Sequence, residues 1–120
     1  MKIPGYTLYG DYYLSDDVIT NVNWKEACEM KEIVTLPNDK KVIAHTLSKE
    51  ELETIPLEER GIGNRWYWTS TPNVPGGNSF MNFVSFDGDF LNSYRSLSHI
   101  DGGARLGFHK KEIKQFLDVE

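Results

Sequence analysis

Hydrophobic and polar positions in the first half of the chain follow two kinds of pattern. Bulky aliphatic and tyrosine side chains, interrupted by glycines, fill residues 3–14 and predict one or two short strands. Segments 23–32 and 48–55 each open with a polar residue followed three positions later by glutamate, which is the spacing of a capping box, and predict two short helices. The β-branched runs 33–36 and 42–44 flank a polar turn and predict two further short strands.

The second half of the chain has the pattern of β-strands. Residues 66–68 are three consecutive bulky aromatics, which cannot all be solvated, so they predict a strand buried on at least one face. Residues 80–86 carry bulk on both faces and predict a central strand, and the Asp-Gly pair 87–88 predicts a tight hairpin after it. The glycine-rich run 103–108 predicts a strand that closes over the first, and the apolar spacing in 110–119 predicts a C-terminal helix.

Composition narrows the class of protein. The 120 residues fit one domain, and 39% hydrophobic with 26% charged residues is typical of a soluble globular protein. The net charge of −5 argues against general affinity for nucleic acid or for acidic membrane surfaces. No run of eighteen apolar residues is present, so no membrane-spanning helix is predicted. Charge and hydropathy together therefore predict neither a nucleic-acid nor a membrane partner.

Cysteine usage bears on the compartment. Cys28 is the only cysteine, so no disulfide can form within the chain, which fits a reducing environment. The first six residues lack the apolar core of a secretory signal. A cytoplasmic location is therefore expected.

Three segments resemble, in this order, the C-type-lectin-like superfamily in its bacterial and phage branches that lack disulfides. Residues 24–28 (Trp-Lys-Glu-Ala-Cys) and the Leu-Pro pair 36–37 are similar to the start of many such domains. Residues 67–71 (Tyr-Trp-Thr-Ser-Thr) are similar to a strand of formylglycine-generating-enzyme-like domains, and 103–108 occupies the place of their final Gly-Val-Arg-Pro strand. Together the segments span about residues 24–108.

The resemblance implies a fold and two structural residues. It implies one compact α+β domain over residues 1–120, with a mixed or antiparallel sheet, two short helices and a C-terminal helix. Trp24 and Trp68 lie inside the matching segments and are expected to be structural. Ala104 and Leu106 replace the valine and proline of the family pattern without breaking it.

The resemblance also implies where a ligand would bind. In such folds the variable loops before the final strand carry the ligand site, here residues 73–102. This segment is rich in Asn, Ser, Gly, Asp, Tyr and His, a composition that suits recognition and is also that of ordinary exposed loops. We expect the loops 73–79 and 91–102 to contact a partner. The candidate partner-binding residues are Trp66, Tyr94, Arg95, His99 and Asp101.

Arg105 is the charged residue that most needs an explanation. An arginine among Ala, Leu and Phe must find carboxylates or carbonyl groups if it is buried. We expect it to be a structural residue held by Asp87, Asp89 or Asp101 rather than a ligand contact. Asp87 and Asp89 flank a hairpin glycine, where aspartate serves turn geometry.

The residues give little support to the chemistry of the family's enzymes and lectins. Formylglycine-generating enzymes hold copper with paired cysteines, whereas Cys28 stands alone on a predicted helix, where a small core residue is the simpler interpretation. The Glu-Pro-Asn or Gln-Pro-Asp signature of calcium-dependent sugar binding is absent, and residues 71–73 are Thr-Pro-Asn. His45, His99 and His109 show no metal-ligand spacing, so we expect neither a metal nor a cofactor.

Three hypotheses for function follow. The first is a non-catalytic recognition module for a protein or glycan. Within this hypothesis a phage or mobile-element origin is expected, because the tract before the last strand resembles the variable region of retroelement-diversified receptor-binding proteins. The second is a small enzyme or enzyme subunit with a site around His99, Asp101 and Arg105. The third is a structural or assembly domain of a virion or surface complex.

Overall fold

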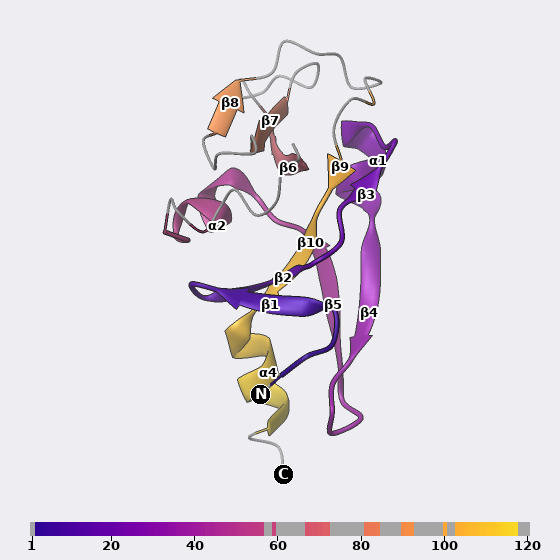
Figure 1. Cartoon of the computed structure of the whole chain (residues 1–120), viewed down its shortest axis with the longest axis vertical. Coiled ribbons are helices and arrows are strands. Elements are labelled where there is room, and N and C mark those ends of the chain that lie inside the picture. Colours follow the sequence, from indigo (N-terminus) through magenta and orange to yellow (C-terminus); the bar gives the residue numbers. More distant parts are fainter. Residues whose placement is uncertain are drawn as a thin grey trace.

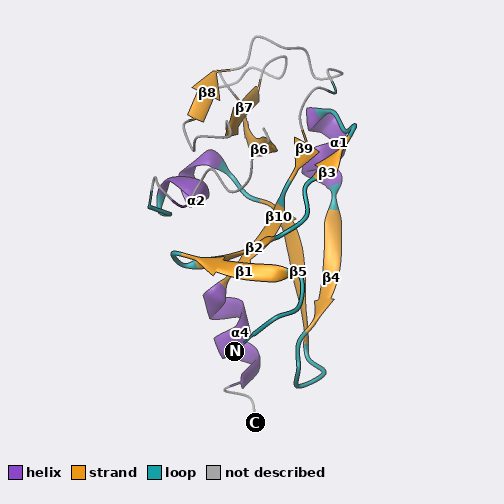
Figure 2. Cartoon of the chain, in the orientation of Figure 1, coloured by secondary structure: helices purple, strands orange, loops and turns teal. Residues whose placement is uncertain are grey.

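Among the residues that the structure describes, two five-stranded sheets carry the fold, and three short helices pack beside them (Figure 1, Figure 2). The chain therefore forms a small α+β domain with antiparallel and mixed sheets, as expected from the sequence. The structure is a computed structural model that describes residues 2–56, 59, 67–72, 81–84, 90–92, 100 and 103–117.

The first sheet is antiparallel throughout and is built mainly from two hairpins. Its strand order is β1 (Tyr6–Tyr9), β2 (Tyr12–Ser15), β10 (Leu106–His109), β5 (Lys41–Thr46) and β4 (Lys31–Thr35). The tyrosine-rich start of the chain forms the β1–β2 hairpin, which turns at Gly10 with a φ of 59°. The two β-branched runs form the β4–β5 hairpin, in which Ile33 pairs with Ile43. Strands β1 and β4 are the two edges of this sheet.

The second sheet is mixed and joins distant parts of the chain. Its strand order is β3 (Ile19–Thr20), β9 (Gly103–Ala104), β6 (Tyr67–Pro72), β7 (Met81–Val84) and β8 (Phe90–Asn92). Strands β6 and β9 are parallel, and the other pairs are antiparallel. β7 lies between β6 and β8, which agrees with the central strand and the hairpin predicted from the sequence. The predicted turn of that hairpin lies outside the described residues.

The helices begin where the sequence places their caps. In α1 (Trp24–Glu29), the Glu26 N–H donates to the Asn23 side chain at 2.9 Å. In α2 (Lys49–Glu53), Ser48 and Glu51 form both bonds of a capping box, at 3.0 and 3.1 Å. Helix α4 (Lys110–Leu117) follows β10 directly and forms the predicted C-terminal helix. None of the described helices is long and apolar enough to cross a membrane.

Two expected boundaries are wrong. The helix predicted over residues 23–32 ends at Glu29, because Lys31 already pairs with His45 in the first sheet. The run 103–108 is not one strand: β9 belongs to the second sheet and β10 to the first, with Arg105 between them. The chain makes a second crossing between the sheets where β2 gives way to β3.

Glycines permit the close approach of strands at these crossings. A Cβ on Gly103 would lie 2.7 Å from the Ile19 carbonyl oxygen, and one on Gly107 would lie 2.6 Å from that of Tyr13. Backbone atoms cannot yield without breaking the ladder, so only glycine fits at these two positions.

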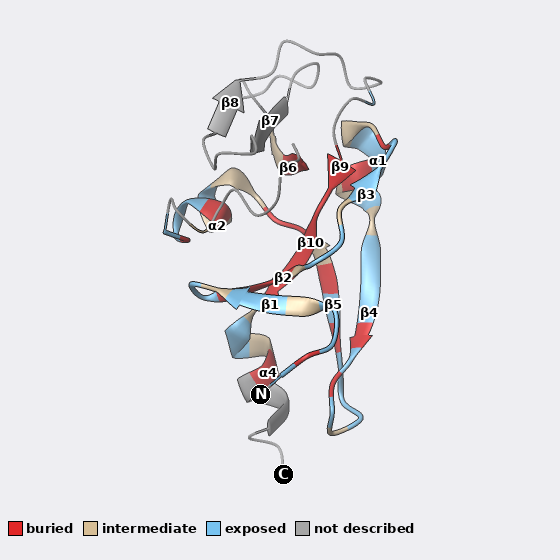
Figure 3. Cartoon of the chain, in the orientation of Figure 1, coloured by how far each residue is buried: buried red, intermediate tan, exposed pale blue. Residues whose placement is uncertain are grey.

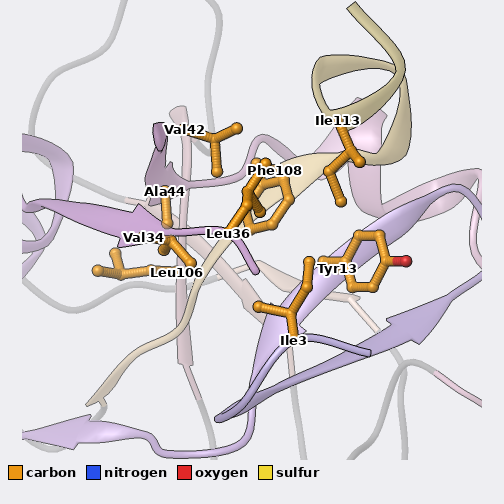
Figure 4. Close-up of a cluster of buried hydrophobic side chains, with 9 residues drawn as sticks. All are labelled: Ile3, Tyr13, Val34, Leu36, Val42, Ala44, Leu106, Phe108 and Ile113. Carbon is orange, nitrogen blue, oxygen red and sulfur yellow. The ribbon is translucent and has the colours of Figure 1, made fainter. Parts of the chain in front are cut away.

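The largest buried cluster covers the inner face of the first sheet (Figure 3, Figure 4). Phe108 is at its centre, fully buried, and stacks on Tyr13 with ring centroids 5.3 Å apart. The members come from the N-terminal segment, the sheet strands and α4: Ile3, Tyr13, Val34, Leu36, Val42, Ala44, Leu106, Phe108 and Ile113. This cluster packs the N-terminal segment and the C-terminal helix onto the same face of the sheet.

Two smaller clusters connect the first sheet to the second. One packs α2 and its flanks against Tyr67 and consists of Tyr12, Leu14, Leu47, Leu52, Ile55 and Tyr67. The other packs α1 against β6 and β9 and consists of Val22, Ala27, Trp68 and Ala104. The junction of the two sheets is therefore well packed.

Candidate functional site

A groove of about 660 Å³ opens at the junction, between the two edge strands of the first sheet. The start of β1 lines one side, and the end of α1 with the start of β4 lines the other. Its residues are Pro4, Gly5, Tyr6, Ser15, Asp17, Ile19, Glu29, Met30, Lys31, Glu32 and Leu106. Leu106 is also part of the main core, so the groove reaches down to buried apolar side chains.

One hydrogen bond joins the two sides of the groove. The Tyr6 hydroxyl donates to the Glu32 carboxylate at 2.7 Å and so connects β1 with β4. The half-buried Tyr6 ring packs against Phe108, with centroids 5.6 Å apart. Burial raises the pKa of Tyr6 above its usual value, and the hydrogen bond and the negative charge of Glu32 raise it further. The hydroxyl therefore keeps its proton at physiological pH and remains a donor.

The groove has an acidic character. Asp17, Glu29 and Glu32 lie on its lining, where Lys31 is the one cation among the described residues, and all four side chains are exposed. No hydrogen bond or ion pair joins the carboxylates of Asp17 and Glu29 to other described residues. Carboxylates along one groove add to a local negative potential.

Arg105 lies at the other crossing between the sheets and is buried, with 2% of its surface exposed. Its guanidinium carbon is 5.8 Å from the ring centroids of both Tyr9 and Tyr67. Burial lowers the pKa of Arg105, and Tyr67, Tyr9 and Asp16 oppose this shift. An arginine retains its charge in such a setting, and two aromatic faces suit that charge.

Three aspartates are the expected partners of Arg105. Asp87, Asp89 and Asp101 lie outside the described residues. Asp16, which is not among those three expected partners, acts on Arg105 electrostatically. Asp16 sits in the neighbouring crossing from β2 to β3, and nothing in the linear sequence marks that proximity.

The residues expected to bind a partner all lie outside the described part of the chain. These are Trp66, Tyr94, Arg95, His99 and Asp101. The loop 73–79 lies outside it as well. Of the loop 91–102, the structure describes Leu91 and Asn92, which belong to β8 rather than to a loop, and the exposed Ile100.

Both tryptophans expected to be structural lie in the packing between α1 and the second sheet. Trp68 is 2% exposed, and its indole N–H donates to the Val22 carbonyl oxygen at 3.2 Å. Trp24, the first residue of α1, packs against the same cluster from its edge.

Cys28, His45 and His109 are the cysteine and histidines that the structure describes. Burial raises the pKa of the Cys28 thiol to about 11, with a further contribution from Glu29, so the thiol is protonated at neutral pH. The His109 ring meets the Tyr12 ring edge-on, with ring centroids 4.7 Å apart, and His45 Nδ1 lies 3.2 Å from the Thr46 carbonyl oxygen. Within the described ranges, no three His, Cys, Asp or Glu residues are placed to hold a metal ion.

Together the fold and the groove define a small α+β domain with an open acidic groove at the junction of two sheets. The chain matches no protein-family model, no curated protein and no solved structure. We therefore infer its function from the groove.

Proposed function

We propose that this protein is a non-catalytic recognition module whose groove binds a segment of a partner protein. The observation that carries the proposal is the groove itself, because its volume of about 660 Å³ lies within the range of ligand sites. It combines apolar side chains, such as Met30 and Leu106, with a few exposed charged groups. That combination suits recognition of an amphipathic segment.

The side chains of the groove favour binding over catalysis. Among the described residues that line it, there is no histidine and no cysteine. Its hydroxyl groups belong to Ser15, which accepts a bond from the Asp17 N–H at 3.3 Å, and to Tyr6, whose raised pKa keeps it protonated at neutral pH and so unavailable as a general base. We infer no covalent or acid–base step from such a set.

We also propose that the domain is C-type-lectin-like. The three segments that carry the resemblance lie around one cluster: Trp68 of β6 packs with Ala27 of α1 and Ala104 of β9. Strand β6 runs parallel to β9, with Tyr67 beside Gly103. This juxtaposition supports a shared framework for the matching segments.

A pair of substitutions tests the groove. Ile19→Trp fills it, since Ile19 is 39% exposed on its lining, and Leu8→Trp is the matched control, since Leu8 is 44% exposed on β1 outside it. A protein captured from source lysate by the immobilised domain is purified, and its Kd is measured for each variant. We expect Ile19→Trp to weaken binding by about tenfold or more and Leu8→Trp to leave it unchanged. Equal affinities for both variants would remove the groove as the recognition surface.

The loops 73–79 and 91–102 are tested in the same measurement. Replacement of Tyr94 and Arg95 together by alanine removes two side chains of the kinds that dominate interface energies. If this double variant loses the partner while Ile19→Trp keeps it, recognition belongs to the loops. Thermal unfolding of each variant checks that the domain remains folded.

A further inference from the structure

We propose that the groove binds a lysine or arginine side chain presented by a basic, amphipathic segment of the partner protein. The inference rests on the proposed function and specifies its ligand. It is carried by one juxtaposition: three carboxylates from different parts of the chain stand around an opening with an apolar base.

The carboxylates are separate in the sequence and are brought together by the fold. Asp17 lies in the crossing between β2 and β3, Glu29 ends α1, and Glu32 is in edge strand β4. Lys31 is the one cation among the described lining residues. A groove with this excess of negative charge favours a positively charged occupant.

The carboxylate of Glu32 is restrained in a position where it can accept a hydrogen bond from such an occupant. The Tyr6 hydroxyl donates to Oε2 of Glu32 at 2.7 Å and so restrains the carboxylate at the groove. A carboxylate accepts several hydrogen bonds, so a bond from Tyr6 still leaves Glu32 able to accept one from an ammonium or guanidinium group. The raised pKa of Tyr6 keeps its hydroxyl protonated, so this donor to Glu32 is not lost by ionisation.

The lining also suits the apolar stem of a long cationic side chain. Met30, Leu106 and Tyr6 line the same groove as the exposed carboxylates and contribute its apolar part. Lysine and arginine bury their methylene stems on such surface while the charged head stays near water and acids.

The arrangement of the acids favours an organic cation over a metal ion. Among the described residues, no three His, Cys, Asp or Glu side chains are close enough to share one metal ion. Carboxylates on separate parts of a groove instead suit a peptide segment that presents a lysine or arginine side chain between them. The occupant is therefore assigned to a basic segment.

A peptide binding experiment tests the assignment. The probe is a fluorescein-labelled Val-Arg-Val-Lys-Val peptide, and its neutral partner carries citrulline and acetyl-lysine at the two basic positions. The groove variant Asp17→Asn/Glu29→Gln/Glu32→Gln removes three charges, and the amide oxygen introduced by Glu32→Gln can still accept the bond from Tyr6. The matched control Asp39→Asn/Glu53→Gln/Glu59→Gln removes three charges outside the groove. Fluorescence anisotropy gives the Kd of each combination.

We expect the basic peptide to bind the wild type and the control variant equally, and to bind the groove variant about tenfold more weakly, since each exposed charge pair contributes modestly. The neutral peptide should bind the wild type at least about tenfold more weakly than the basic peptide does. Addition of 0.5 M NaCl should weaken the binding of the basic peptide alone. Equal losses in the groove and control variants would overturn the assignment, because net charge would then be the cause.

Further outcomes separate this inference from the proposed function. Equal binding of the basic and neutral peptides, lost in Ile19→Trp, would overturn the cation assignment and leave the groove as a recognition site. Displacement of the peptide by spermidine at equal concentration would assign the groove to small polyamines and overturn the peptide assignment. Failure of both peptides to bind overturns the inference, while the proposed function is decided by the captured partner and Ile19→Trp.

Discussion

The two sheets of this domain are held together in different ways. The first sheet consists largely of two local hairpins with four and five paired positions, closed by a large buried cluster. In the second sheet, β9 pairs with β3 and β6 over two positions each, and both partners are distant in the sequence. Local pairs form at a low entropic cost, whereas distant pairs must overcome loop closure. The second sheet therefore depends more on close backbone approach and on single buried side chains.

Helix α1 connects the two sheets. The Thr46 hydroxyl of β5 donates to the Ala27 carbonyl oxygen at 2.5 Å, and the Trp68 indole of β6 donates to the Val22 carbonyl just before the helix at 3.2 Å. The groove lies at the end of this helix. Its shape thus depends on both sheets, and the comparison between them bears on the site.

The largest expected effect comes from the core of the first sheet. Phe108→Ala removes a fully buried ring that stacks on Tyr13 and contacts Tyr6, and we expect it to lower the free energy of unfolding by about 3–5 kcal/mol. Urea unfolding measures this change. The control Leu8→Ala, on an exposed position of the same sheet, should cost less than about 0.5 kcal/mol. A cost for Phe108→Ala as small as that of the control would contradict the proposed importance of this core.

A smaller effect distinguishes the sheets directly. Gly103→Ala places a Cβ 2.5 Å from Val18 and 2.7 Å from the Ile19 carbonyl, so we expect β3 and β9 to separate and the free energy of unfolding to fall by about 1–3 kcal/mol. Hydrogen exchange should accelerate at the amides of β6 and β9 more than at those of β5. Gly107→Ala, which crowds Tyr13 and Leu14, should reverse that order. The same exchange pattern in both variants would show that the sheets unfold as one unit.

The sequence predicts the local elements well, because their determinants are local. Asn23 and Ser48 mark the helix starts by capping, and the β-branched runs around the turn at 37–40 form a hairpin. β3 escapes prediction because a strand of two residues, Ile19–Thr20, has no periodicity to recognise. The boundary between β9 and β10 at Arg105 is not predicted, because an apolar, glycine-rich run does not reveal that the chain changes sheets.

The candidate site is predictable only in its composition. Surplus acid is visible in the net charge, but Asp17, Glu29 and Glu32 become neighbours of one groove only through the pairing of β2 with β10, of β10 with β5 and of β5 with β4. The bond from Tyr6 to Glu32 joins residues 26 positions apart. Such proximity is a property of topology and has no signature in the chain.

The smallest effect concerns the bond across the groove. Tyr6→Phe keeps the ring against Phe108 but removes the donor to Glu32, and we expect a loss of about 1 kcal/mol in the free energy of unfolding at pH 7. The pKa of Tyr6 is raised in the folded protein, so the folded state binds this proton more tightly than the unfolded chain does. The stability that the proton supplies is complete below pH about 10, the unfolded value for tyrosine, and is lost as the pH rises above it.

Comparison of the two proteins isolates this contribution. Tyr12 and Cys28 also have raised pKa values, but they are present in both wild type and Tyr6→Phe, so their effects cancel in the difference. The difference in free energy of unfolding should be constant from pH 7 to 9 and should shrink from pH 10 to 11. A constant difference across the whole range would mean that Tyr6 and Glu32 are not coupled, and the groove would then lack the restrained carboxylate on which cation binding depends.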